Sequence, residues 1–156
     1  MMITAEREQD AGKLFEFEAS RSCSILGHKV TVLDRAEDNV LCRRSAADAG
    51  TYFTLPADKL EELRQTIAGG WRALGDGRTE EMSRVTGYFV LDGYADRFYF
   101  ANGSCALRAY IRMAGEFSRI PAESVPRARA VFTLFHECAR LLQGAGVARE
   151  FFALVP

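Results

Sequence analysis

His136 and Glu137 are the first candidates for chemistry, because a His-Glu pair opens the zinc-binding helix of many metalloproteases. In such a helix a second histidine stands four residues after the first, and here that position holds Arg140. The other histidine of the chain is His28. A zinc site needs about three protein ligands. The sequence therefore predicts no metal site.

Thiol chemistry is the second candidate, since a cysteine beside a histidine can act as a nucleophile. His136 and Cys138 are two residues apart in an expected helix and so point to different faces. Cys23, Cys42, Cys105 and Cys138 form no C-x-x-C pair. A free cysteine usually behaves as a small buried hydrophobic residue, which is our expectation for the last three. A pairing of His136 with a cysteine from the sheet remains the alternative.

Two further patterns predict turns and loops, and we expect no cofactor. Gly144-Ala145-Gly146 resembles half of a dinucleotide-binding loop, but that loop follows a strand and opens a helix. Here the glycines follow an expected helix. Asp76, Glu80 and Glu81 fall in one polar stretch without the spacing of a calcium-binding loop.

Arginine and tyrosine alternate with apolar residues along two neighbouring expected strands. Arg97 and Tyr99 lie in the first strand, and Arg108, Tyr110 and Arg112 lie in the second. Both residue types are enriched at protein interfaces. Basic and aromatic side chains on a sheet can also stack single-stranded nucleic acid. The net charge of -1 and the lack of a ribonucleoprotein pattern argue against nucleic acid.

Trp71 is the one tryptophan of the chain, and it follows a glycine pair that we expect to end a helix. It is either a core residue beneath the following loop or an interface anchor, and both alternatives stay open. The interface candidates are Arg97, Tyr99, Arg108, Tyr110, Arg112 and Trp71.

A run of strands comes first among the elements that would position these residues. Residues 14–19 alternate between apolar and acidic side chains, the period of a half-buried strand. Residues 29–33 are rich in β-branched side chains, and a polar cluster then closes a hairpin onto residues 40–43. Residues 52–55 form a short extended piece, and residues 75–83 a polar loop.

Helices and turns complete the pattern. Pro56 suits the first turn of a helix, which we expect to end at Gly69-Gly70. Strands at 85–91, 97–101 and 105–113 are separated by Asp-Gly and Asn-Gly turns. The last helix, from about residue 124 to 143, has two adjacent apolar stripes, which is wider than a surface helix needs. It is therefore either the spine of the fold or partly an interface, and the second alternative predicts a homodimer.

These elements predict an α+β fold. We expect an antiparallel sheet of about five to six strands with two main helices on one face, in a single domain over residues 1–156 with a polar lead-in at 1–12. The helix starts Leu55-Pro56-Ala57-Asp58 and Ile120-Pro121-Ala122-Glu123 also favour a βββα–βββα pseudo-repeat.

The composition is that of a globular protein, with 48% hydrophobic and 26% charged residues. The first residues carry no basic region followed by an apolar run, so they do not read as a secretory signal. No apolar run approaches the ~20 residues of a membrane helix. We therefore expect a cytoplasmic protein with reduced cysteines and no membrane contact.

Several parts of the chain together resemble small bacterial α+β immunity proteins, which neutralise a cognate toxin. They are the strands at 14–43, the helix start at 55–58, the Asp92-Gly93 hairpin and the closing helix. The resemblance implies a protein that covers the active site of a toxin and carries no catalytic group of its own.

Three functional hypotheses follow. The first is a non-catalytic cytoplasmic protein-binding module of the immunity type. The alternative is a small enzyme or ligand binder, with a pocket between sheet and helices lined by tyrosine, arginine and His28 or His136. The third is a single-stranded nucleic-acid binder.

Overall fold

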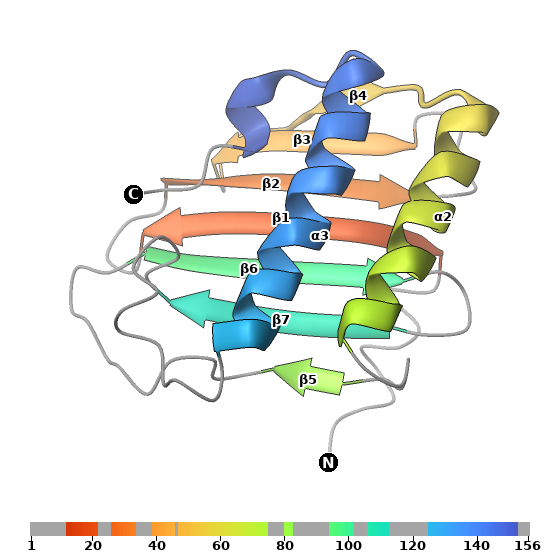
Figure 1. Ribbon diagram of the computed structural model, residues 1–156. Coiled ribbons are helices and arrows are strands. Elements are labelled where there is room, and N and C mark those ends of the chain that lie inside the picture. Colours follow the sequence, from red (N-terminus) through yellow and green to blue (C-terminus); the bar gives the residue numbers. More distant parts are fainter. Residues whose placement is uncertain are drawn as a thin grey trace.

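The computed structural model describes residues 12–21, 26–33, 39–45, 47–74, 80–82, 94–101, 106–112 and 125–152. These residues form one sheet with two long helices packed on the same face (Figure 1). The fold is therefore α+β, with both helices on one side of the sheet, as predicted.

The sheet has seven described strands, which pair in the order β4-β3-β2-β1-β6-β7-β5. Their bounds are β1 Lys13–Arg21, β2 Leu26–Leu33, β3 Val40–Ser45, β4 Thr51–Phe53, β5 Glu80–Met82, β6 Tyr94–Ala101 and β7 Ala106–Arg112. The series from β4 to β7 is antiparallel throughout. The short β5 adds to the edge parallel to β7.

The centre of the sheet is the antiparallel pair of β1 and β6, and it carries an aromatic core. Phe15 lies opposite Phe100 and Phe17 lies opposite Phe98, with ring centroids 5.6 and 5.4 Å apart. All four rings are buried. Such pairs add about 0.5–1.5 kcal/mol each beyond the burial of apolar area. The strand predicted from the alternation of residues 14–19 therefore lies at the centre of the sheet and supplies part of the core.

The first long helix, α2, spans Ala57–Leu74. A buried asparagine fixes its entry: the Asn39 side chain accepts a hydrogen bond from the Leu55 amide (2.6 Å) and donates one to the Leu55 carbonyl (3.1 Å). The inner side of the helix is buried through Leu60, Leu63 and Ile67, which have the spacing expected of an amphipathic helix.

The predicted end of this helix at Gly69-Gly70 is wrong, because α2 continues for four more residues. The reason lies in the second long helix, α3, which spans Val125–Gly144. A Cβ atom on Gly70 would lie 2.6 Å from Leu134 Cδ1. The glycine therefore lets the two helices approach closely, and it does not act as a helix stop. Trp71 is part of α2 and does not follow a break.

The described members of both apolar stripes of α3 are buried, except Leu141, which is partly buried. The buried members are Val131, Phe132, Leu134, Phe135, Cys138, Ala139 and Leu142. They contact the sheet, where the ring of Phe98 packs against Phe132 and Phe135, and they contact α2. Helix α3 runs across several strands (Figure 1). Of the two alternatives for this helix, the spine of the fold accounts for its wide apolar surface. The observation that motivated a homodimer is thereby explained within one chain.

The described chain ends on a short 3-10 helix, η3, at Arg149–Phe152. It contacts β2 and β3, with Phe151 and Phe152 buried. Arg44 on β3 forms an ion pair with Glu150, and its guanidinium carbon lies 5.7 Å from the centre of the Phe151 ring. This short segment is therefore part of the core.

Two expectations for the second half differ from the structure. Strand β5 falls in the stretch predicted to be a polar loop, because three residues are too few to show alternation. The βββα–βββα pseudo-repeat is not confirmed: four strands precede α2, and in the described second half β5 pairs in parallel with β7. The predicted strand at 85–91, the Asp-Gly and Asn-Gly turns and the Ile120 helix start lie outside the described residues.

Candidate binding face

Helices α2 and α3 cover one face of the sheet, and no described element covers the other (Figure 1). We call this second face the open face. Its described side chains alternate along the strands with the buried core residues. They are Lys13, Glu16, Glu18, Lys29, Thr31, Leu41, Arg43, Tyr52, Arg97, Tyr99 and Arg108.

Tyr99 and Arg108 form the most specific contact of the open face. They are register partners on β6 and β7, and the guanidinium carbon of Arg108 lies 4.6 Å from the centre of the Tyr99 ring. This is a cation–π contact, which holds both side chains in one geometry. Burial raises the pKa of Tyr99, Lys13 lowers it and Glu16 raises it again. The phenol therefore stays neutral at physiological pH.

Arg97 lies beside this pair, with its side chain exposed. It is opposite Glu18 on β1 and opposite Tyr110 on β7. Arg112 is the register partner of Ala95, also on β6. Tyr110 and Arg112 are described by their backbone alone, which lies in the same block of two strands. The structure thus brings the five predicted sheet residues together on adjacent strands.

The sixth predicted residue, Trp71, does not join them. It is described by its backbone alone, and that backbone is part of α2 on the helix-covered side of the sheet (Figure 1). The sequence grouped it with the sheet residues by side-chain type, whereas the layers of the fold separate it from them.

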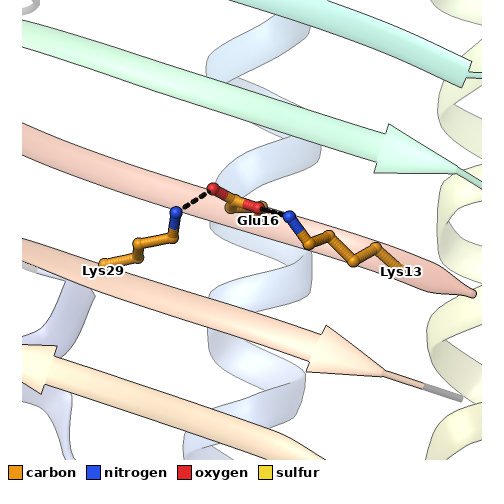
Figure 2. Close-up of polar contacts among 3 residues, drawn as sticks. All are labelled: Lys13, Glu16 and Lys29. Atoms are coloured by element: carbon orange, nitrogen blue, oxygen red, sulfur yellow. Dashed lines mark hydrogen bonds and ion pairs between the residues drawn. The ribbon is translucent and has the colours of Figure 1, made fainter. Parts of the chain in front are cut away.

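Glu16 is a residue of the open face that the sequence prediction did not single out. Its two carboxylate oxygens accept hydrogen bonds from Lys13 and Lys29, each at 2.5 Å (Figure 2). Burial opposes the charged form of Glu16, but the two ammonium groups outweigh it and lower its pKa. The sequence contains little indication of this cluster, because Lys29 lies on a different strand from Glu16. Only the register of β1 and β2 brings the two side chains close together.

Basic groups outnumber acidic ones among the described residues of the open face. The basic residues are Lys13, Lys29, Arg43, Arg97 and Arg108, and the acidic residues are Glu16 and Glu18. One acidic group, Glu16, is already bound by two lysines. The described residues of this face therefore carry an excess of positive charge.

The candidate thiols lie in the core. Cys42 and Cys138 are free and buried, and burial raises the pKa of Cys42 to about 12 and raises that of Cys138 as well. A protonated, buried thiol is a poor nucleophile. His136 is exposed on the other side of α3. Cys23 and Cys105 lie outside the described residues.

The described part of the chain contains no metal cluster, and its described groove differs from the expected pocket. It contains no group of three histidine, cysteine, aspartate or glutamate side chains that could hold a metal ion. A groove of about 340 Å³ runs between the exposed sides of α2 and α3. It is lined by Lys59, Glu62, Thr66, Glu137, Arg140, Leu141 and Gly144. This lining has neither the tyrosine nor the histidine expected for a pocket between sheet and helices.

No protein-family model matches the chain, and no curated protein matches it either. Among the described elements, no helix combines the length and the apolar character that crossing a membrane requires.

Proposed function

We propose that this chain is a non-catalytic protein-binding module and that the open face takes the partner. The observation that carries the proposal is the meeting of Arg97, Tyr99 and Arg108 on adjacent strands, with Tyr99 stacked on Arg108. Arginine and tyrosine are the residue types most often found among the energetically important residues of interfaces.

A sheet suits this role because its side chains are already positioned before the partner arrives. The stack with Tyr99 restricts the guanidinium of Arg108, so less rotamer entropy is lost on binding. An arginine fork binds a carboxylate with two parallel hydrogen bonds. We infer that the partner presents an acidic surface, with aspartate or glutamate side chains facing Arg97 and Arg108.

The finer proposal is that the partner is a bacterial toxin and that the chain neutralises it in the cytoplasm. The resemblance to immunity proteins supports this reading. Immunity proteins act by covering a site, which needs complementary charge and shape but no chemistry of their own.

The test is complex formation by the tagged protein in its native cell, measured by pull-down, mass spectrometry and light scattering. A double variant, Arg97→Glu and Arg108→Glu, reverses two charges on the open face. We expect it to lose a stoichiometric protein partner, because like charges then face an acidic surface. The matched control, Arg140→Glu with Arg149→Glu, reverses two exposed charges away from the open face and is expected to keep the partner.

Three outcomes would contradict the proposal. The wild-type protein could hold no stoichiometric partner, the control could lose the partner equally, or the retained molecule could be single-stranded nucleic acid with salt-dependent affinity. The toxin proposal has a separate test, in which this protein is expressed in cells together with a toxin encoded beside its gene. The wild type and the control variant should restore growth of these cells, whereas the open-face variant should not.

A further inference from the structure

Asp96 is a carboxylic acid placed in the core without a partner. It lies near the start of β6, on the helix-covered face, and its side chain is 0% exposed. Within the described part of the chain, neither of its carboxylate oxygens has a hydrogen-bond partner. Buried polar atoms of proteins are nearly always hydrogen-bonded, so such a group calls for an explanation. The proposed binding face does not use it, because Asp96 lies on the opposite side of the sheet from Arg97.

A second unpartnered polar atom lies in the same row of the sheet. Asp96 is the register partner of Ala19 on β1, and Ala19 is the register partner of His28 on β2. His28 shares its side of β2 with the buried Val30 and Val32, and its buried Nδ1 atom has no hydrogen-bond partner among the residues that the structure describes. Only the methyl group of Ala19 stands in the row between the two polar side chains.

The described surroundings of this row are apolar. Phe98 is the next residue of β6 on the same face, and its ring packs against Phe132 and Phe135 of α3 at 5.5 and 5.2 Å. On β1 the register partner of Asp96 is Ala19, and on β7 it is Ile111, which is described by its backbone alone. Among the described residues, His28 is therefore the titratable group that shares this row with Asp96.

The neutral and the ionised form of Asp96 need different surroundings. A neutral carboxyl can remain in an apolar layer, whereas a carboxylate there needs a cation or water. Burial raises the pKa of Asp96 to about 7. The folded form thus favours the protonated carboxyl, and this preference is lost as the pH rises through neutrality.

Water that reaches this row would meet two polar groups in need of hydrogen bonds. A buried water molecule usually makes two to four hydrogen bonds. The Asp96 oxygens and the Nδ1 of His28 lie on one face about two strand spacings, roughly 10 Å, apart, so each would be hydrated by its own water. We propose that the row Asp96, Ala19 and His28 is a proton-controlled opening of the sheet, closed over a neutral carboxyl and opened to water when that carboxyl ionises.

The primary test is amide hydrogen exchange of β6 and the end of β1, measured from about pH 5 to about pH 8 and corrected for intrinsic exchange. In the wild type, the opening equilibrium of these segments should increase by at least about tenfold over this range. Asp96→Asn, which cannot ionise, should abolish the increase. Glu137→Gln changes an exposed carboxyl on α3 and should leave it unchanged.

A second measurement keeps the test valid even if the asparagine variant does not fold. The carboxyl carbon of Asp96 in the wild type, followed by NMR, should titrate near neutrality. An Asp96 titration in the ordinary acidic range would overturn the proposal. So would exchange that is independent of pH in the wild type, or equally pH-dependent in Asp96→Asn.

Discussion

Glu16 and Glu18 illustrate how identical side chains on one strand acquire different roles. Both alternate with the buried phenylalanines of β1, and the sequence predicted only that they face away from the core. The register then places Glu16 opposite Thr31, within reach of Lys29, and Glu18 opposite Arg97. Only Glu16 carries described ion pairs to two lysines. Neighbours on adjacent strands cause this difference between Glu16 and Glu18, and the sequence pattern of one strand does not show which residues those neighbours are.

Replacing Glu16 with glutamine tests the energetic role of this pair of contacts. We expect Glu16→Gln to lower the free energy of unfolding by roughly 1–2 kcal/mol near neutral pH, because charge-assisted hydrogen bonds are lost. Its lowered pKa means that the stabilisation is present above the ordinary pKa of 4.5 and is lost as the pH falls through the folded-state value. Urea unfolding at several pH values measures both effects.

The two proteins should therefore converge in stability at low pH. Glu137→Gln, at an exposed position of α3, is the control and should change stability little. A constant difference between Glu16→Gln and the wild type across the whole pH range would show that the carboxylate charge is not the cause.

At the scale of elements, the two adjacent glycines of α2 have different environments. A Cβ on Gly69 would meet nothing within 4 Å, whereas one on Gly70 would meet Leu134 at 2.6 Å. The sequence pattern Gly-Gly is typical of a helix end. The structure continues the helix because the packing against α3 outweighs the low helix propensity of glycine, which costs about 1 kcal/mol per residue.

This contrast predicts opposite effects of the same substitution at neighbouring positions. Gly69→Ala should raise the free energy of unfolding by up to about 1 kcal/mol through helix propensity. Gly70→Ala should be less stable than Gly69→Ala by roughly 1–3 kcal/mol, because the methyl group overpacks the interface with Leu134. Thermal or urea unfolding of the two variants measures this difference. Equal stabilities would mean that the two helices can move apart to accommodate the methyl group at residue 70.

At the scale of the whole molecule, the sheet joins segments that are distant in the chain. The central strands β1 and β6 come from opposite halves of the sequence, and η3 near the carboxyl end packs against β2 and β3. The Asp96 row and the open face share β6, so the two proposals concern opposite sides of one strand. Long-range packing of this kind makes the terminal segment part of a single cooperative core.

Substitutions at two neighbouring residues of η3 compare the contribution of core packing to stability with that of a surface ion pair. Phe151→Ala removes a ring that is 3% exposed, and we expect a loss of about 3–5 kcal/mol. Glu150→Ala removes the exposed ion pair to Arg44, which should cost less than about 1 kcal/mol. Urea unfolding of both variants provides the comparison. A loss below 1 kcal/mol for Phe151→Ala would show that the segment is not part of the cooperative core.

The sequence by itself determined the element types and the class of the fold. Alternation in β1 and the apolar spacing of α2 and α3 are local signals, since the side-chain periods of strands and helices are fixed by backbone geometry. The same signals placed Arg97, Tyr99 and Arg108 on one side of two adjacent strands.

Only the tertiary structure decided how these elements meet. Strand order, the parallel addition of β5, the lysine pair around Glu16 and the row that joins Asp96 to His28 all depend on register between strands. The continuation of α2 through Gly70 depends on its distance from α3. These are contacts between residues far apart in sequence, and their energies arise from packing and desolvation that no local pattern records.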